Sequence, residues 1–130
     1  MTDVEALFRY RLKEARETLV DAERMLAGDF ALRSVVNRAY YAMFYALLAL
    51  FLRNEIRLKT SKHQGVISSF DREFVQPGRV ETRHSKALHR VFELRQQGDY
   101  REFSDISREK ATTAVDEARD FIAAVDALIE

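Results

Sequence analysis

Residues 34–52 read SVVNRAYYAMFYALLALFL, and this stretch decides the fold. Its second part, from Ala39 to Leu52, contains no charged residue, no glycine and no proline. An apolar run of this length is shorter than the roughly 18–20 residues that cross a bilayer. We therefore expect a buried helix at the centre of a helical domain, and we predict no contact with a membrane.

Glycine and proline divide the rest of the chain into further helices. The sequence has one Pro and four Gly, and Gly28, Pro77–Gly78 and Gly98 lie where the apolar periodicity changes. The helices predicted on either side of these breaks run from about Thr2 to Ala27, Asp29 to Arg53, Ser61 to Val75 and Val80 to Gln97, with a last one carrying Ala111 to Ile129. No long alternation typical of strands occurs. The sequence predicts an all-α, up-and-down bundle of four to five helices in a single domain, residues 1–130.

Capping signals refine three of these boundaries. Thr2 and Glu5 have the spacing of a capping box, as do Ser61 and Gln64, and Asp29 is a candidate N-cap for the second helix. In the last helix, apolar residues repeat at alternating intervals of four and three. We expect this helix to pack nearly antiparallel to another long helix.

The composition is that of a globular domain, with 47% hydrophobic and 32% charged residues. Lys plus Arg and Asp plus Glu number 21 each, so the net charge gives no general attraction for duplex DNA or an anionic membrane. Any contact with nucleic acid must be local. The absence of cysteine excludes disulfides and thiolate metal sites, and residues 1–10 do not resemble a signal peptide. We expect a cytoplasmic protein.

A polar stripe crosses the apolar central helix. Ser34, Arg38, Tyr41 and Tyr45 are spaced four, three and four residues apart, so they share one face, and Asn37 and Tyr40 flank them. A guanidinium in such a helix needs a carboxylate or a bound anion, because an unpaired buried charge costs several kcal/mol.

Two interpretations of the stripe remain open at this point. In a structural one, Arg38 pairs with an internal carboxylate, with Asp99 as the first candidate and Asp71 as the second. In a functional one, Arg38 holds a phosphate beside aromatic faces that accept a base, which requires the stripe to border a groove.

The three histidines are candidates for proton transfer. His63 lies in the sequence Lys62-His63-Gln64-Gly65 at a predicted helix start, where backbone N–H groups favour anions. His84 and His89 fall among basic residues, and a solvated basic face explains them best. Their spacing does not favour a metal site, and no phosphate-binding glycine loop or nucleophile motif is present. We expect no metal and no cofactor.

The run from Ser34 to Tyr45, SVVNRAYYAMFY, strongly resembles small stand-alone HEPN proteins of prokaryotes. The likeness continues through Ser61-Lys62-His63-Gln64-Gly65-Val66-Ile67 and Gly98-Asp99-Tyr100, and it extends over essentially the whole chain. This resemblance implies a helical bundle that dimerises around a shared cleft. It also implies a partner, a minimal nucleotidyltransferase.

Toxic members of the family are metal-independent endoribonucleases whose motif is an Arg followed four to six residues later by His. By resemblance, Arg38 takes the place of the Arg, and Tyr45 stands where many relatives have His. A phenol, with a reference pKa near ~10, is a poorer general base at neutral pH than an imidazole near ~6.5. The resemblance thus implies catalytic roles for Arg38, Tyr45 and His63.

Three classes of function follow from the sequence. The first is a dimeric module that binds a nucleotide or RNA, or that docks its transferase, with Ser34, Asn37, Arg38, Tyr41 and Lys62 as binding residues. The second is an endoribonuclease toxin, and the third is a purely structural dimeric bundle. Because Tyr45 replaces His, we expect weak or no ribonuclease activity without metal.

Overall fold

The computed structural model describes residues 2–100 and 106–129. Its elements are α1 (Asp3–Ala27), α2 (Leu32–Arg53), α3 (His63–Phe70), the π-helix η1 (Asp71–Val75), α4 (Thr82–Gly98) and α5 (Arg108–Ile129). No strand occurs in these residues. The predicted all-α bundle is confirmed.

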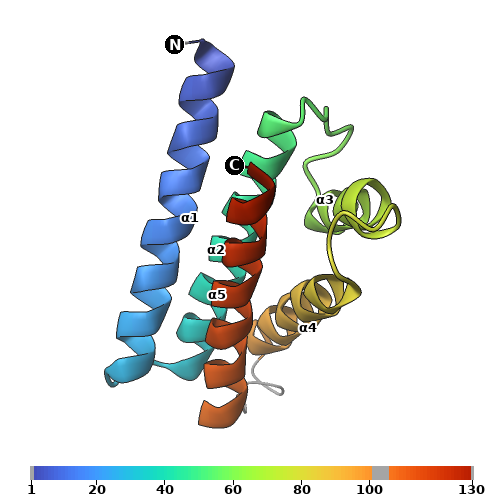
Figure 1. Cartoon of the computed structure of the whole chain (residues 1–130). Helices are drawn as coiled ribbons and strands as arrows, with labels where there is room; N and C mark the ends of the chain where they lie inside the picture. Colours follow the sequence, from blue (N-terminus) through green and yellow to red (C-terminus); the bar gives the residue numbers. More distant parts are fainter. Residues whose placement is uncertain (1, 101–105, 130) are drawn as a thin grey trace.

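The long helices alternate in direction along the chain, as Figure 1 shows: α1 descends, α2 ascends, α4 descends obliquely and α5 ascends. The last helix is therefore antiparallel to α1, as the sequence predicted. Two ion pairs between these helices agree with this direction. Arg16 contacts Asp126 at 3.1 Å, and Glu23, later on α1, contacts Arg119, earlier on α5, at 2.7 Å. The short α3 and η1 lie to one side of α1, α2 and α5 (Figure 1).

Helix α2 is the core of the bundle and packs on α1, α4 and α5. Its buried residues are Val35, Val36, Ala39, Tyr40, Ala42, Met43, Phe44, Ala46, Leu47, Ala49, Leu50 and Phe51. By length and composition α2 resembles a membrane span, but 67% of its most apolar window is buried inside the bundle. Such burial is typical of a core helix, as the sequence predicted.

The predicted caps have mixed outcomes. Thr2 caps α1, because its hydroxyl accepts a hydrogen bond from the Glu5 backbone N–H at 3.1 Å. The prediction for Asp29 is wrong, since α2 begins later with Ala31 at its N-cap and no side-chain cap. The Ser61–Gln64 capping box is also wrong. Instead, Lys62 is the N-cap of α3, and the Thr60 hydroxyl accepts a hydrogen bond from the Lys62 backbone N–H in the preceding turn.

The segment predicted as one helix up to Val75 changes its hydrogen bonding after Phe70. Residues Asp71 to Val75 form a π-helix, in which the Gln76 backbone N–H donates to the Asp71 carbonyl at 2.8 Å. Insertions of this kind widen a helix locally and turn its side chains to new directions. Here the Asp71 carboxylate accepts hydrogen bonds from Ser85 at 2.6 Å and from His89 at 2.7 Å, which fastens η1 to α4.

Candidate functional site

The polar stripe of α2 is its half-buried face. Ser34, Asn37, Arg38, Tyr41 and Tyr45 are all partly exposed, whereas the other sides of the helix are covered by α1, α4 and α5. The predicted shared face is therefore present. The elements next to the stripe change along the length of α2, so the residues of the stripe make different contacts.

A cavity of about 400 Å³ adjoins the middle of the stripe, between α2, the start of α3 and the second half of α4. Its lining residues are Tyr41, Lys62, His63, Gln64, Phe92, Arg95 and Gln96. The described lining combines two basic side chains, one imidazole, two aromatic rings and two amides, and it includes no carboxylate. This composition suits an anionic ligand with a flat, hydrogen-bonding part.

Arg95 is the best-anchored cation of this site. Its Nε–H donates to Asn37 Oδ1 and its Nη2 donates to the Tyr41 hydroxyl, both at 3.2 Å. Its guanidinium carbon lies 5.2 Å from the ring centroid of Tyr40 and 5.1 Å from that of Tyr41. Both hydrogen-bond acceptors are neutral, and among the described residues Arg95 forms no ion pair. No carboxylate in the described part of the chain therefore neutralises its charge beside the cavity.

Arg38, on α2 itself, also contacts the ring of Tyr41. Its guanidinium carbon lies 5.4 Å from the Tyr41 ring centroid, within cation–π range. The expected pairing with Asp99 is not formed within the described part of the chain, and Asp71, the second candidate, binds Ser85 and His89 instead. The physical reason is exposure: a half-exposed guanidinium keeps part of its hydration and does not require an internal carboxylate.

His63 is the residue that connects α3 to the stripe. Its Nδ1 lies 2.7 Å from the hydroxyl oxygen of Tyr40, which is itself fully buried. The imidazole stacks on Phe44 with ring centroids 4.2 Å apart and meets Tyr41 edge-on at 5.8 Å. The ring is consequently held in one orientation, with Nδ1 directed at the core.

The ionisable groups of the site are shifted toward their neutral forms. Burial lowers the pKa of His63, and the nearby positive charge of Arg95 lowers it further. Burial raises the pKa of the Tyr40 phenol, and the Arg95 charge opposes this only in part. Burial also raises the pKa of Tyr45. At neutral pH, therefore, His63 is an uncharged imidazole and both phenols keep their protons.

The structure brings together some of the predicted site residues and separates others. Tyr41, Lys62 and His63 line the cavity, and Asn37 joins them through Arg95. Ser34, Arg38 and Tyr45 are not among the lining residues that are described, although Arg38 contacts the ring of Tyr41, which is. Tyr45 lies one turn beyond Tyr41 on α2, with ring centroids 5.8 Å apart.

The cavity continues along α3 and α4. A second cavity of about 420 Å³ shares Gln64, Phe92 and Gln96 with the first and adds Ile67, Ser68, His89 and Glu93. The two cavities together form a groove, which we call the α3–α4 groove. His89 is exposed, as predicted, and its bond to Asp71 lies at the far end of this groove.

The expectation for His84 is wrong, because this residue is buried rather than on a solvated face. Its ring lies edge-on to Phe121 at 6.3 Å, and burial lowers its pKa. His84 precedes Ala87 and Leu88 by three and four residues, so it belongs to the same inner face of α4. The sequence interpretation relied on the basic residues next to His84 and not on its position along the helix.

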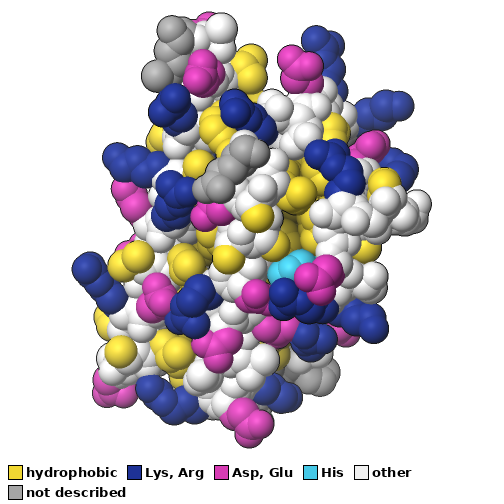
Figure 2. Space-filling view, viewed as in Figure 1, with side chains coloured by type: hydrophobic (Ala, Val, Ile, Leu, Met, Phe, Trp, Pro, Cys, Tyr) yellow, Lys and Arg dark blue, Asp and Glu magenta, His cyan; other side chains and the backbone are white. Residues whose placement is uncertain are grey.

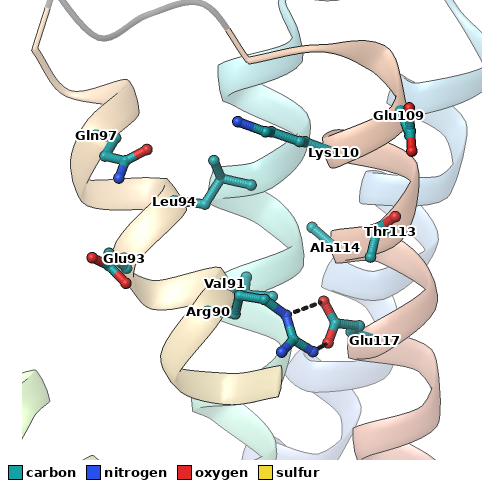
Figure 3. Close-up of a pocket in the computed structure, with 10 residues that line it drawn as sticks. All are labelled: Arg90, Val91, Glu93, Leu94, Gln97, Glu109, Lys110, Thr113, Ala114 and Glu117. Atoms are coloured by element: carbon teal, nitrogen blue, oxygen red, sulfur yellow. Dashed lines mark hydrogen bonds and ion pairs between the residues drawn. The ribbon is translucent and has the colours of Figure 1, made fainter. Parts of the chain in front are cut away.

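A further cavity of about 310 Å³ lies between α4 and α5. Figure 3 shows Arg90 of α4 joined to Glu117 of α5 at one end of it, with Leu94 and Ala114 nearby. The Arg90–Glu117 pair neutralises its own charge, and no histidine or aromatic ring lines this cavity among the described residues. Figure 2 shows acidic and basic side chains interspersed over the face that it displays. Lys62 and Arg95, which form no ion pair within residues 2–100 and 106–129, lie instead in the first cavity of the α3–α4 groove.

No group of three or more His, Asp, Glu or Cys side chains in the described residues is placed to hold a metal ion. The chemistry available in the groove is that of two cations, amides, one phenol, two imidazoles and the Glu93 carboxylate at its far end. Apart from the carboxylate, these groups bind and orient oxygen anions and planar rings.

Arg95 was missed in the sequence, although a signal for it exists. It follows Leu88 by seven residues and Phe92 by three, so helical periodicity places it on the buried face of α4. A cation at a core-facing position is the same signal that identified Arg38 on α2. Tyr40 was noted only as a flanking residue, and its contact with His63 comes from a distant part of the chain.

The fold and groove define a class of protein: a small helical bundle with a basic, aromatic-lined groove beside its core helix. Comparison with known sequences then identifies the family, because the HEPN domain profile matches residues 8–128. The chain belongs to the HEPN domain family, which confirms the resemblance found in the sequence.

Three relatives illustrate the family. A UPF0332 protein of Thermotoga maritima is 40% identical over 130 residues, covering 100% of this chain and 96% of the relative. Two proteins of Methanocaldococcus jannaschii carry the name "Putative toxin". One is 32% identical over 85% of this chain and 81% of its own length, and the other is 36% identical over 75% and 60%, respectively.

Proposed function

We propose that this chain is a homodimeric HEPN protein that binds RNA or a nucleotide in the α3–α4 groove, within a toxin–antitoxin-like system that includes a minimal nucleotidyltransferase. The observation that carries the binding proposal is the cavity beside Tyr41, where Lys62 and Arg95 are present and none of the described lining residues is acidic. Phosphate oxygens are the ligands that such a pair of cations recognises.

The geometry of Arg95 supports a phosphate rather than a structural role alone. Two of its N–H groups are used by Asn37 and Tyr41, which fix the plane of the guanidinium. A guanidinium carries five N–H donors, so others remain for a ligand. Because its orientation is already set, little rotamer entropy is lost when an anion binds.

The remainder of the groove supports recognition of a base or of a second nucleotide. Phe92 and Tyr41 offer aromatic surface, and the amides of Gln64 and Gln96 offer donors and acceptors at the junction of the two cavities. Stacking on aromatic rings combined with hydrogen bonds to base edges is the usual mode of recognition of single-stranded RNA.

Binding is tested by fluorescence anisotropy with a labelled single-stranded oligoribonucleotide, competed by mononucleotides. Arg95→Gln removes the cation and is expected to weaken binding by about tenfold or more, since charged hydrogen bonds contribute about 1.5–3 kcal/mol. The matched control is Arg90→Gln on the same helix, whose charge is neutralised by Glu117 outside the groove. Equal affinity of wild type and Arg95→Gln would contradict the proposal.

A second candidate function is metal-independent RNA cleavage, favoured by the relatives named "Putative toxin". Such cleavage needs a base for the 2′-hydroxyl and an acid for the leaving oxygen, besides a cation. Tyr45, with its raised pKa, is rarely ionised, so we expect weak or no cleavage. The assay compares wild type, His63→Ala and Tyr45→His on one RNA without metal. Robust wild-type cleavage that His63→Ala leaves unchanged would refute this expectation.

The partner and compartment belong to the same proposal. A minimal nucleotidyltransferase is expected to bind the folded protein and raise its melting temperature, because a ligand selective for the native state stabilises it. Co-expression of the neighbouring gene, followed by affinity purification, tests the pairing. The cytoplasm is the compartment where RNA and nucleotides are available, and cell fractionation tests this assignment.

A further inference from the structure

The contact between Tyr40 and His63 determines where the imidazole proton lies. The Tyr40 oxygen and His63 Nδ1 are 2.7 Å apart, and either atom can act as the donor. If Nδ1 carries the hydrogen, Nε2 presents a lone pair to the groove. If the phenol donates, Nδ1 is the acceptor and a neutral imidazole carries its hydrogen on Nε2.

Hydrogen-bond satisfaction decides between these two arrangements. Tyr40 is fully buried, and its hydroxyl has His63 as its one hydrogen-bond partner in the described part of the chain. Were Nδ1 the donor, the phenolic hydrogen would lack an acceptor, and an unsatisfied buried donor costs about 1–3 kcal/mol. With Tyr40 as the donor, both groups are satisfied.

The charges around the pair favour the same arrangement. Protonation of both imidazole nitrogens would place a cation beside Arg95, whose charge already lowers the pKa of His63. Ionisation of Tyr40 is opposed by its burial. The combination that avoids both costs is a neutral phenol donating to a neutral imidazole.

We propose that Tyr40 is a positioning residue that holds His63 in its Nε2–H form, so that His63 offers a hydrogen-bond donor, and not a base, to an anionic oxygen in the α3–α4 groove. The ligand class is a phosphate group, bound jointly by this N–H and by Arg95. The inference rests on the proposed function for the identity of the ligand, but the state of the imidazole is a property of the protein alone.

One consequence concerns catalysis. A neutral imidazole held as the Nε2–H form cannot accept a proton at Nε2, because that nitrogen already carries one, and its Nδ1 lone pair is engaged by the Tyr40 hydroxyl. It can stabilise negative charge on a phosphate oxygen. His63 would therefore add to binding more than to proton transfer, consistent with a binding module.

The direct test is nitrogen NMR of uniformly ¹⁵N-labelled protein at neutral pH, observing the two ring nitrogens of His63 through their carbon-bound protons. The expected result is a protonated Nε2 and an unprotonated Nδ1. A protonated Nδ1, or protonation of both nitrogens, would overturn the proposal. This measurement needs no ligand, so it remains decisive even if RNA binding fails.

Two variants separate positioning from packing. Tyr40→Phe keeps the buried ring and removes the hydroxyl, and it is expected to give a mixture of tautomers and a raised pKa of His63. Phe44→Leu disturbs the stack on the same imidazole but retains the hydrogen bond, so the Nε2–H form should persist. An unchanged tautomer in a folded Tyr40→Phe protein would refute the role of Tyr40. If that variant does not fold, the wild-type spectrum decides.

Amide substitutions test the donor itself. The side-chain amide of Gln places an N–H near the position of Nε2, whereas that of Asn places it near Nδ1. With the labelled oligoribonucleotide, His63→Gln is expected to retain affinity within about threefold, and His63→Asn to lose about tenfold. The reverse order would contradict a donor at Nε2. Absence of wild-type RNA binding would count against the proposed function and leave the spectroscopic result intact.

Discussion

Two arginines meet at the ring of Tyr41 and differ in what holds them. Arg95 donates to Asn37 and to the Tyr41 hydroxyl, so its position is tied to α2. Arg38 contacts only the face of the ring among the interactions seen in the described residues. Removing the first therefore alters the packing of α4 on α2, whereas removing the second alters mainly the positive charge beside the Tyr41 ring.

For Arg38→Ala we expect a change in the free energy of unfolding below about 1 kcal/mol, because an exposed cation–π contact contributes about 0.5–1 kcal/mol. RNA or nucleotide binding should nevertheless weaken, since a cation is lost beside the groove. Urea unfolding and anisotropy measure the two effects on the same preparation. A variant with wild-type stability and wild-type binding would remove the support for Arg38 as a site residue.

His84 and His63 make the stability dependent on pH. Burial lowers the pKa of both relative to the ordinary value, so the unfolded chain takes up protons first as the pH falls. Their contribution to stability is present above about pH 6.5 and is lost below it. We expect the free energy of unfolding to be lower at about pH 5.5 than at about pH 7.5.

Substitution identifies the histidines responsible. His84→Gln and His63→Gln should each reduce this difference, and the double variant should reduce it further. Urea titrations of each variant at the two pH values measure this difference in the free energy of unfolding. Stability that stays constant or rises toward pH 5.5 in the wild type would show that other groups dominate.

At the scale of elements, η1 orients one carboxylate toward α4. Asp71 receives hydrogen bonds from Ser85 and His89, and these bonds connect the α3–η1 arm to the bundle. The arm also forms one wall of the groove, through Gln64 and Ser68. The π-helical turn therefore helps to hold one wall of the candidate site against α4.

Asp71→Ala is expected to destabilise the protein by about 1–2 kcal/mol, because two hydrogen bonds at a half-buried position lose their acceptor. The control is Glu73→Ala in the same turn, whose carboxylate contacts Arg72 at 3.5 Å near the surface and should contribute less. Chemical denaturation compares the variants. Equal stability of both would show that the Asp71 contacts do not fasten the arm.

At the scale of the whole molecule, the α2 stripe continues beyond the cavity as an apolar surface. Leu48 and Leu52 lie on it, three and seven residues after Tyr45, and both are partly exposed. An exposed face of this kind on a core helix favours contact with a second copy. The proposed homodimer would place the two stripes near each other.

Light scattering at micromolar concentration should give a mass of about twice 15.1 kDa. Leu48→Glu should shift the protein toward the monomer, because a carboxylate in an apolar interface is costly. Val20→Glu, at an exposed position of α1, is the matched control and should leave the mass unchanged. A monomeric wild type across that range would refute the dimer.

The fold was largely predictable because its signals are local. Apolar periodicity identified every long helix, and Gly28 and Gly98 marked the ends of two of them. The errors concern starts of helices: Asp29 and Ser61 are good N-cap residue types, but the chain enters α2 and α3 later than they do. Most helical stability in proteins comes from the packing of an apolar face, so a favourable cap residue does not by itself fix where a helix begins.

The sequence by itself determined the helical class and the central position of α2. It also determined which residues form the polar stripe on one face of that helix. Each of these results depends on residue spacing within one element. The tertiary structure alone decided which residues gather at the cavity. It placed Arg95 and His63 beside Tyr41, directed His63 toward Tyr40 and left Tyr45 outside. These contacts join positions far apart in the chain, and their geometry depends on how the helices pack, which no local pattern records.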